Sequence, residues 1–211
     1  MKKLFFIFLT IFTFFTFLIT SSFVFAQTPV TGKRIVLDAG HSGTDSGSTE
    51  CLGLPEKDAN LDIAFRLKAL LEADGAIVGM TRNDDSTLSN NGRYTFANNF
   101  GGEALVSIHL NGSVDHSKNG TKGLYGQPKK DKTFTEVVHA SLAKKLGVSD
   151  LGTTNFASGV LLKSKMAATI QEAIFISNTQ ECVLLTDGTG NRQQQIAQAL
   201  HDGIVNYFAS R

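Results

Sequence analysis

Short apolar runs alternate along this chain with longer segments in which apolar residues recur every three or four positions. Runs with the length and β-branched content of buried strands lie at 35–38, 77–81, 104–108, 123–126, 160–162 and 169–175. Helical spacing covers 56–74, 89–100, 133–146 and 191–209, with a short helical turn at 180–185, and 149–159 is expected to be irregular. This alternation predicts an α/β fold in which a parallel or mostly parallel sheet is covered by helices on both faces.

The segment 4–19 is almost wholly apolar and rich in Phe, and it follows Lys2 and Lys3. Together with the small-x-small-like tripeptide at 24–26, this pattern predicts a secretory signal over 1–26, with Gln27 as the mature N-terminus. An uncleaved membrane anchor is the alternative, because the apolar run is close to the ~17-residue lower limit for spanning a bilayer. In either case we expect the rest of the chain outside the cytoplasm, in the periplasm or at the extracellular cell wall.

The chain has 211 residues, which leaves a short lead at 27–33 and one domain at 34–211 that is large enough for a proper core. The formal net charge is +1, and it becomes −1 once Lys2 and Lys3 are removed with the signal. No basic field is therefore expected, which argues against nucleic acid as a partner. We expect a monomer.

Two cysteines, Cys51 and Cys182, lie far apart in the chain. In an exported protein they can form a disulfide, but the sequence leaves free or buried thiols equally open, since it does not show whether the two residues approach each other. Neither belongs to a C-x-x-C pair, so a zinc site made of cysteines is disfavoured.

A glycine-rich turn follows the first predicted strand. Gly40, Gly43 and Gly47 interrupt regular structure, and His41 lies among them. Side chains just past a core strand of an α/β fold are held by a rigid scaffold and face a cleft. The spacing of the glycines fits neither the dinucleotide-binding nor the P-loop pattern, so a nucleotide site is a poor interpretation.

Two further polar residues stand at the ends of predicted elements. Glu56 begins a helix, and His109 follows the apolar run at 104–108. With His41 they supply two nitrogens and one oxygen, which is a donor set for zinc that keeps a fourth position open for water. Taken singly, each has an ordinary explanation, as a loop histidine, a satisfied core histidine and a carboxylate favoured by a helix N-terminus. Only the joint pattern favours a metal.

Other polar residues give weaker signals. His116 lies in a polar loop and could assist the site, whereas His139 and His201 fall on predicted helices and are expected to be structural or exposed. We expect Asp38 to orient the first histidine or the loop backbone rather than to bind metal. Arg82 is expected to be a surface or scaffold residue.

Four motifs occur in order along the chain. They read I-V-L-D-A-G-H-S-G-T-D-S-G from 35, G-L-P-E-K-D-A-N-L-D-I-A from 53, L-V-S-I-H-L-N from 105 and Q-E-A-I-F-I-S-N from 171. Together they resemble the zinc-dependent N-acetylmuramoyl-L-alanine amidases of bacterial cell walls, the amidase-3 family, over 34–208. The resemblance implies a twisted six-stranded sheet flanked by helices and peptidoglycan as the substrate.

The resemblance also implies a single zinc ion held by His41, Glu56 and His109. The first motif departs from the family's more usual D-P-G-H-G-G, since Ala39 replaces the proline and Ser42 a glycine. These changes concern the shape of the loop and leave the three metal ligands intact.

The family's catalytic glutamate falls on Glu172. A carboxylate within the apolar segment 167–176 is costly unless it has a partner or a task. In other zinc hydrolases a glutamate that does not bind the metal takes a proton from water and passes it to the leaving amine. The alternative for Glu172 is an ion pair with a lysine such as Lys163 or Lys165.

These residues predict an exported zinc enzyme that hydrolyses the amide between N-acetylmuramic acid and L-alanine in peptidoglycan. Two alternatives are a peptidoglycan-binding protein with little turnover and a zinc peptidase that acts on the stem peptide. Some members of the family carry a regulatory helix between the second histidine motif and the catalytic glutamate. Predicted strands and a helix already occupy this segment here, so we hypothesise an open site that needs no activator protein.

Overall fold

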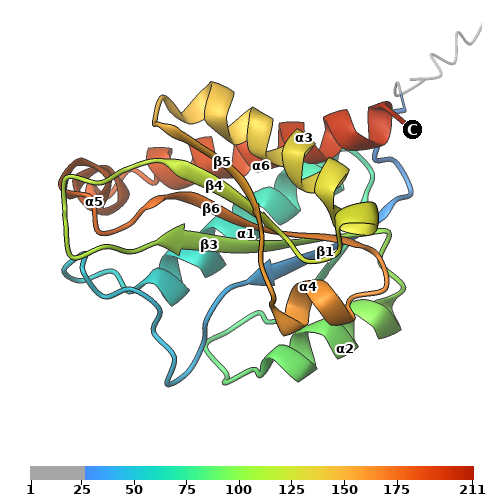
Figure 1. The fold of residues 1–211 in the computed structure, drawn as a ribbon, viewed down its shortest axis with the longest axis horizontal. Coiled ribbons are helices and arrows are strands. Elements are labelled where there is room, and N and C mark those ends of the chain that lie inside the picture. Colours follow the sequence, from blue (N-terminus) through green and yellow to red (C-terminus); the bar gives the residue numbers. More distant parts are fainter. Residues whose placement is uncertain (1–26) are drawn as a thin grey trace, which may run out of the picture.

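A computed structural model describes residues 27–211 of the chain. The signal predicted over 1–26 lies outside the described residues. Figure 1 shows a central sheet with helices above and below it. No helix within 27–211 is both long enough and apolar enough to cross a membrane.

The sheet consists of β1 (Arg34–Ala39), β2 (Ile77–Met80), β3 (Ala104–Asn111), β4 (Thr121–Tyr125), β5 (Asp150–Asn155) and β6 (Ala167–Phe175). Its strand order is β2-β1-β3-β6-β4-β5. β4 runs antiparallel to β6, and the other neighbouring strands are parallel. The mostly parallel six-stranded sheet expected from the sequence is therefore confirmed.

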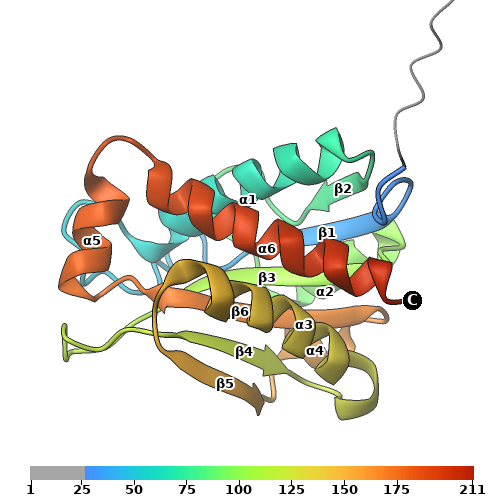
Figure 2. The ribbon, with the colours of Figure 1, turned by 90° about the horizontal axis from the view of Figure 1, so that it is seen from above.

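The helices form one layer on each face of the sheet (Figures 1 and 2). One face is covered by α1 (Glu56–Ala73), α3 (Pro128–Leu146) and α6 (Asn191–Ala209). The opposite face carries α2 (Asn90–Phe100) and the short α4 (Gly159–Lys163). α5 (Thr179–Thr186) lies beyond one end of the sheet.

The larger hydrophobic core lies between the sheet and the three-helix layer. β1 and β3 are buried almost throughout, as expected for parallel strands covered on both faces. The helices contribute apolar side chains at helical spacing, which are Ile63, Leu67 and Leu71 from α1 and Ile196, Leu200 and Ile204 from α6. This packing fixes α1 and α6 on the sheet and with them the start of α1, where Glu56 lies.

Two sequence predictions are wrong in the segment between α3 and β6. The segment expected to be irregular, 149–159, contains β5, an edge strand whose polar residues give no alternating pattern. The apolar run at 160–162, expected to be a strand, lies in α4. The prediction failed because a run this short does not distinguish a buried strand from a helical turn.

β3 also continues past 108, so His109 lies inside the strand rather than after it.

β1 and β3 are neighbours in the sheet, but the chain segments connected to them pass on opposite faces. α1 follows β1 on one face, whereas α2 precedes β3 on the other. Such a switch in the direction of the connections leaves a crevice at the carboxyl ends of the strands, where α/β folds bind ligands.

A disulfide joins Cys51, in the loop between β1 and α1, to Cys182 in α5. Cys51 is buried, so the bond fastens this loop to the end of the molecule. The pairing that the sequence left open is therefore present.

Candidate metal centre and catalytic cleft

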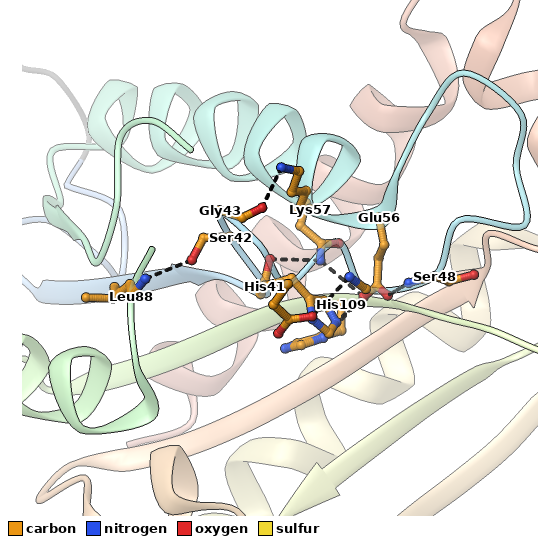
Figure 3. A network of polar contacts seen from close by, with 12 residues as sticks. His41, Ser42, Gly43, Ser48, Glu56, Lys57, Leu88 and His109 are labelled. Carbon is orange, nitrogen blue, oxygen red and sulfur yellow. Dashed lines mark hydrogen bonds and ion pairs between the residues drawn. The ribbon is translucent and has the colours of Figure 1, made fainter. Parts of the chain in front are cut away.

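Three side chains from three separate elements meet at this crevice. His41 follows β1, Glu56 opens α1, and His109 lies near the end of β3. One ligand atom from each lies within 4.8 Å of the others, in an arrangement that can hold a metal ion. Figure 3 shows Glu56 pointing from the first turn of α1 toward the two imidazoles. The structure thus brings together the three ligands expected from the sequence.

The carboxylate of Glu56 is fixed in position by its surroundings. Its Oε1 atom lies 3.2 Å from His41 Nε2 and 3.2 Å from His109 Nδ1. The same oxygen accepts a hydrogen bond from the Leu110 backbone N–H at 3.0 Å, and Oε2 accepts one from the Ser48 N–H at 3.0 Å. Glu56 is 4 % exposed, so these bonds replace water around a buried carboxylate.

Two glycines make room for the three side chains. A Cβ atom at Gly40 would lie 2.3 Å from Nε2 of His109. At Gly47, where φ is +64°, a Cβ would lie 2.5 Å from Oε2 of Glu56. The glycines of the turn are thus required at these positions because the ligand side chains pass directly over the backbone.

His41 has a strained backbone that two buried arginines hold in place. Its φ is 60°, in the left-handed region that side chains other than glycine rarely adopt. Arg93 of α2 donates to the carbonyl oxygens of Ala39 and His41 at 2.8 Å each. Arg82 donates to those of Ala39 at 2.9 Å and Gly40 at 3.1 Å. Arg82 is therefore a scaffold residue, and the two guanidinium groups together hold the carbonyls of the last residue of β1 and of the two residues after it.

Asp38, the last polar residue of β1, anchors Arg93. Its carboxylate accepts hydrogen bonds from Arg93 at 2.7 Å and from Ser107 and Thr81 at 2.6 Å each. Burial would raise the pKa of Asp38, but the charge of Arg93 and these hydrogen bonds hold it below its usual range. Asp38 thus orients the histidine loop through Arg93 and does not reach the metal position.

The three clustered side chains shift one another's pKa values. Burial alone would lower the pKa of His41, but Glu56 and then Asp45, whose Oδ1 lies 2.9 Å from His41 Nδ1, raise it to about 9. The pKa of His109 is also raised, by Glu56 and Glu172 against the effect of burial. The pKa of Glu56 is held far below its usual range, because both histidines outweigh its burial. The site therefore attracts positive charge.

Glu172 lies beside this group on the neighbouring strand. It is paired in register with His109 across β3 and β6, and it is half-buried in the wall of a cavity of about 690 Å³. Burial raises its pKa, although the nearby histidines and Lys122 act in the opposite direction. The lysine opposite Glu172 is thus Lys122 of β4, and neither Lys163 nor Lys165 lines this cavity.

The remaining histidines take no part in the cleft. His116 pairs with Glu50 at 3.3 Å, His139 with Asp150 at 2.7 Å, and His201 with Asp74 at 3.0 Å. None of the three lines the cavity that holds His41, His109 and Glu172. Arg93 was not among the residues expected from the sequence, because a single arginine in a polar helix carries no signal of its own.

Comparisons with known proteins show which family the chain belongs to. The family model described as N-acetylmuramoyl-L-alanine amidase matches residues 35–206. The chain belongs to this amidase family. N-acetylmuramoyl-L-alanine amidase LytC of Bacillus subtilis (strain 168) is 35% identical over 185 residues, which cover 86% of this chain and 37% of LytC. The probable cell wall amidase LytH of Staphylococcus epidermidis is 34% identical over 188 residues, which cover 88% of this chain and 62% of LytH.

Solved amidase structures share the fold. The catalytic domain of CwlV, an N-acetylmuramoyl-L-alanine amidase from Bacillus (Paenibacillus) polymyxa var. colistinus, superimposes with a TM-score of 0.78 at 32% identity. The match covers 85% of this chain and 99% of the CwlV domain. The match thus takes in nearly the whole CwlV domain, whereas the chain spans only 37% to 62% of the length of the two curated relatives above.

Proposed function

We propose that this chain is an exported zinc enzyme that hydrolyses the amide between N-acetylmuramic acid and L-alanine in peptidoglycan. Its membership of the amidase family supports the bond that is cleaved. The observation that carries the proposal is the position of Glu172, which lies in register beside the cluster of His41, Glu56 and His109 at the wall of one cavity.

The donor set suits zinc. Two imidazole nitrogens and one carboxylate oxygen leave a fourth position for water or substrate, as in catalytic zinc sites. Both histidines already direct a nitrogen at Oε1 of Glu56, and Gly40 and Gly47 clear the space around the three side chains. A bound zinc ion would supply Lewis acidity, which activates water and polarises the scissile carbonyl.

Glu172 is the proposed general base and then general acid. It takes a proton from the attacking water as the new C–O bond forms on the muramoyl carbonyl carbon. It passes this proton to the nitrogen of L-alanine as the C–N bond breaks, which leaves a muramoyl carboxylate and a free peptide amine. Because burial raises the pKa of Glu172, its carboxyl holds a proton closer to neutral pH than an exposed glutamate does, which suits both steps.

The cleft is proposed to be open without an activator protein. The cavity is lined from 110–135 by Asn111, Lys122 and Leu124, and the group that can hold a metal contains no residue of that segment among residues 27–211. Full activity of the isolated chain would support this part of the proposal, whereas activity only on addition of a cell-envelope extract would contradict it.

Product identification tests the proposed function. The chain is incubated with purified peptidoglycan, with and without a chelator, and released material is identified by mass spectrometry. Intact stem peptides that begin at L-alanine, lost on chelation and restored by zinc, are the expected result. Cleavage within the stem would indicate a peptidase, and no product from a zinc-loaded chain would indicate a peptidoglycan-binding protein.

Two variants distinguish the residue proposed to transfer the proton from a residue proposed to bind the metal. Glu172→Ala should bind zinc as the wild type does and lose nearly all turnover, because it removes the base and leaves the ligands. His109→Ala should lose both. Full activity of Glu172→Ala would contradict the proposed role.

A further inference from the structure

The cavity beside the metal centre continues across the face of the sheet that carries α2 and α4. Its floor consists of alternate residues from three neighbouring strands, which are Ser107, His109, Ile170, Glu172, Lys122 and Leu124. Phe156 and Val160 form part of its wall near α4, and Leu88 precedes α2 on the other side. The space of about 690 Å³ is large enough for several residues of a substrate, well beyond the single amide that reacts.

One cation on this floor has no partner among the described residues 27–211. Lys122 is half-buried on β4, directly opposite Glu172 in the antiparallel register. Its amine forms neither an ion pair nor a hydrogen bond with any residue in 27–211, whereas Arg93, the other cation of the lining, is bound to Asp38 and two carbonyls. A half-buried ammonium that faces a cavity is available to an anion brought in by a ligand.

The chemistry of the proposed reaction limits where this anion can be. In a muramoyl peptide, the muramic carboxyl group is the acyl half of the scissile amide and carries no charge. Any carboxylate of the substrate near the reacting bond therefore belongs to the peptide.

We propose that Lys122 is a substrate-binding residue that pairs with a free carboxylate of the stem peptide, so that this chain selects carboxylate-bearing stems. The inference rests on the proposed amidase function. Opposite residues on antiparallel strands have Cβ atoms about 4.5–5.5 Å apart, so a carboxylate bound at Lys122 lies within one side-chain length of Glu172. The ion pair thus orients the peptide next to the group that transfers the proton.

The apolar surroundings favour this pairing. Leu124 and Ile170 flank Lys122 and Glu172 on the floor, and a bound peptide covers them from water. A charge-assisted hydrogen bond is stronger where solvent is excluded than on an open surface. Loss of the carboxylate should therefore be felt mainly in binding.

A different role for Lys122 makes a different prediction. If the ammonium served only to hold the pKa of Glu172 down, its removal would change the turnover of every substrate by the same factor. A carboxylate-binding role affects only those substrates that carry the carboxylate.

The test uses two synthetic N-acetylmuramoyl-L-alanyl peptides that differ in one group. The residue after L-alanine carries a free α-carboxylate in one and a carboxamide in the other. The values of kcat and KM are measured for zinc-loaded wild type, Lys122→Met and Lys122→Arg. Lys163→Met is the matched control, since it removes an exposed lysine of α4 and changes the net charge equally. Binding of both peptides is also measured by titration calorimetry.

We expect the wild type to favour the carboxylate peptide by roughly 10- to 100-fold in kcat/KM, the range of a hydrogen bond to a charged group. Lys122→Met should bring the ratio close to one through a higher KM for the carboxylate peptide, whereas any change in kcat that arises from the pKa of Glu172 should be the same for both peptides. Lys122→Arg should keep most of the preference, and Lys163→Met all of it.

An equal loss for both peptides in Lys122→Met, or no preference in the wild type, would overturn the proposal. Failure of the proposed function is a separate outcome, because it would appear as no hydrolysis of either peptide by wild type. Calorimetry still decides in that case: wild type should bind the carboxylate peptide more tightly than the carboxamide, and Lys122→Met should bind the two alike. Equal affinities in wild type, or a preference that persists in Lys122→Met, would overturn the inference.

Discussion

Arg93 joins the metal centre to the stability of the fold, and Arg93→Met should damage both. Arg93 and Asp38 are 5 % and 0 % exposed, so the substitution leaves a fully buried carboxylate without its cation. Breaking a buried ion pair by removing one partner costs about 3–5 kcal/mol. Since domains of this kind are stable by about 5–15 kcal/mol, the variant should fold at 25 °C with a clearly lower free energy of unfolding.

Chemical denaturation measures this loss, and two further variants assign it. Arg66→Met removes a partly exposed arginine that pairs with Asp62 at 3.0 Å, and should cost no more than about 1 kcal/mol. Asp38→Asn in the Arg93→Met background removes the unpaired charge and keeps an oxygen acceptor for one of the Ser107 and Thr81 hydroxyls, while the other hydroxyl can accept from the amide, so it should recover part of the loss. A loss below about 1 kcal/mol in Arg93→Met, or no recovery in the double variant, would refute the reasoning.

The pH dependence of the same variant gives a second check. In the wild type the folded-state pKa of Asp38 is lowered, so the pair stabilises the fold at neutral pH and this stabilisation is lost as the pH falls below the usual aspartate pKa of about 3.9. Without Arg93, burial instead raises the pKa of Asp38. The difference in stability between wild type and Arg93→Met should therefore shrink as the pH is lowered from 7 toward 4.

The effect on the metal centre follows from the backbone of His41. Its left-handed conformation costs of order 1–3 kcal/mol, and Arg93 holds its carbonyl oxygen at 2.8 Å. Releasing this carbonyl should weaken zinc binding by roughly 10- to 100-fold, the usual effect of losing an outer-shell contact. Competition with a chromophoric chelator measures the affinity, and an unchanged value in folded Arg93→Met would show that Arg93 does not position the ligand.

Three further predictions concern other parts of the site. Replacing Cys51 and Cys182 by serine opens a loop with a sequence separation of 131 residues and should lower the free energy of unfolding by up to about 5 kcal/mol. Reduction of the wild-type disulfide should have the same effect, and an unchanged denaturation midpoint would contradict this prediction. Because the pKa of His41 is raised to about 9, its proton stabilises the metal-free fold fully below pH 6.5, and this stabilisation is lost as the pH rises through 9. Zinc must displace the same proton, so zinc affinity measured by calorimetry should rise about tenfold per pH unit from pH 7 to 9. An affinity that does not change with pH would contradict this prediction. Gly40→Ala places a methyl group 2.3 Å from Nε2 of His109 and should abolish tight zinc binding. Gly159→Ala is the control, since the nearest atom to its methyl group is 3.6 Å away, and it should bind zinc as the wild type does. Equal zinc affinity in the two variants would contradict the steric argument.

The sequence located most elements because their signals are local. The β-branched run at 35–38 and the helical spacing at 56–74 each follow from residues close together in the chain. β5 escaped prediction since an exposed edge strand needs no apolar alternation, and the run at 160–162 was too short to have a period. The structure of these two segments is decided by the neighbours that they pack against.

The cluster of three side chains proposed to hold the metal was predictable from the sequence, but the residues that support it were not. His41, Glu56 and His109 were recognised together because their motifs occur in a fixed order. The role of Arg93 depends on the placement of α2 beside β1, and the role proposed for Lys122 depends on the register of β4 with β6; neither is encoded in a local pattern. The disulfide likewise became visible only when α5 was placed beside the loop before α1.

The most direct test of the proposed metal centre is a crystal of the zinc-loaded chain measured on both sides of the zinc absorption edge. We predict one anomalous peak bounded by His41, Glu56 and His109, with Glu172 nearby but not coordinated. A peak elsewhere, a fourth protein ligand that closes the site, or no peak after loading would contradict the account.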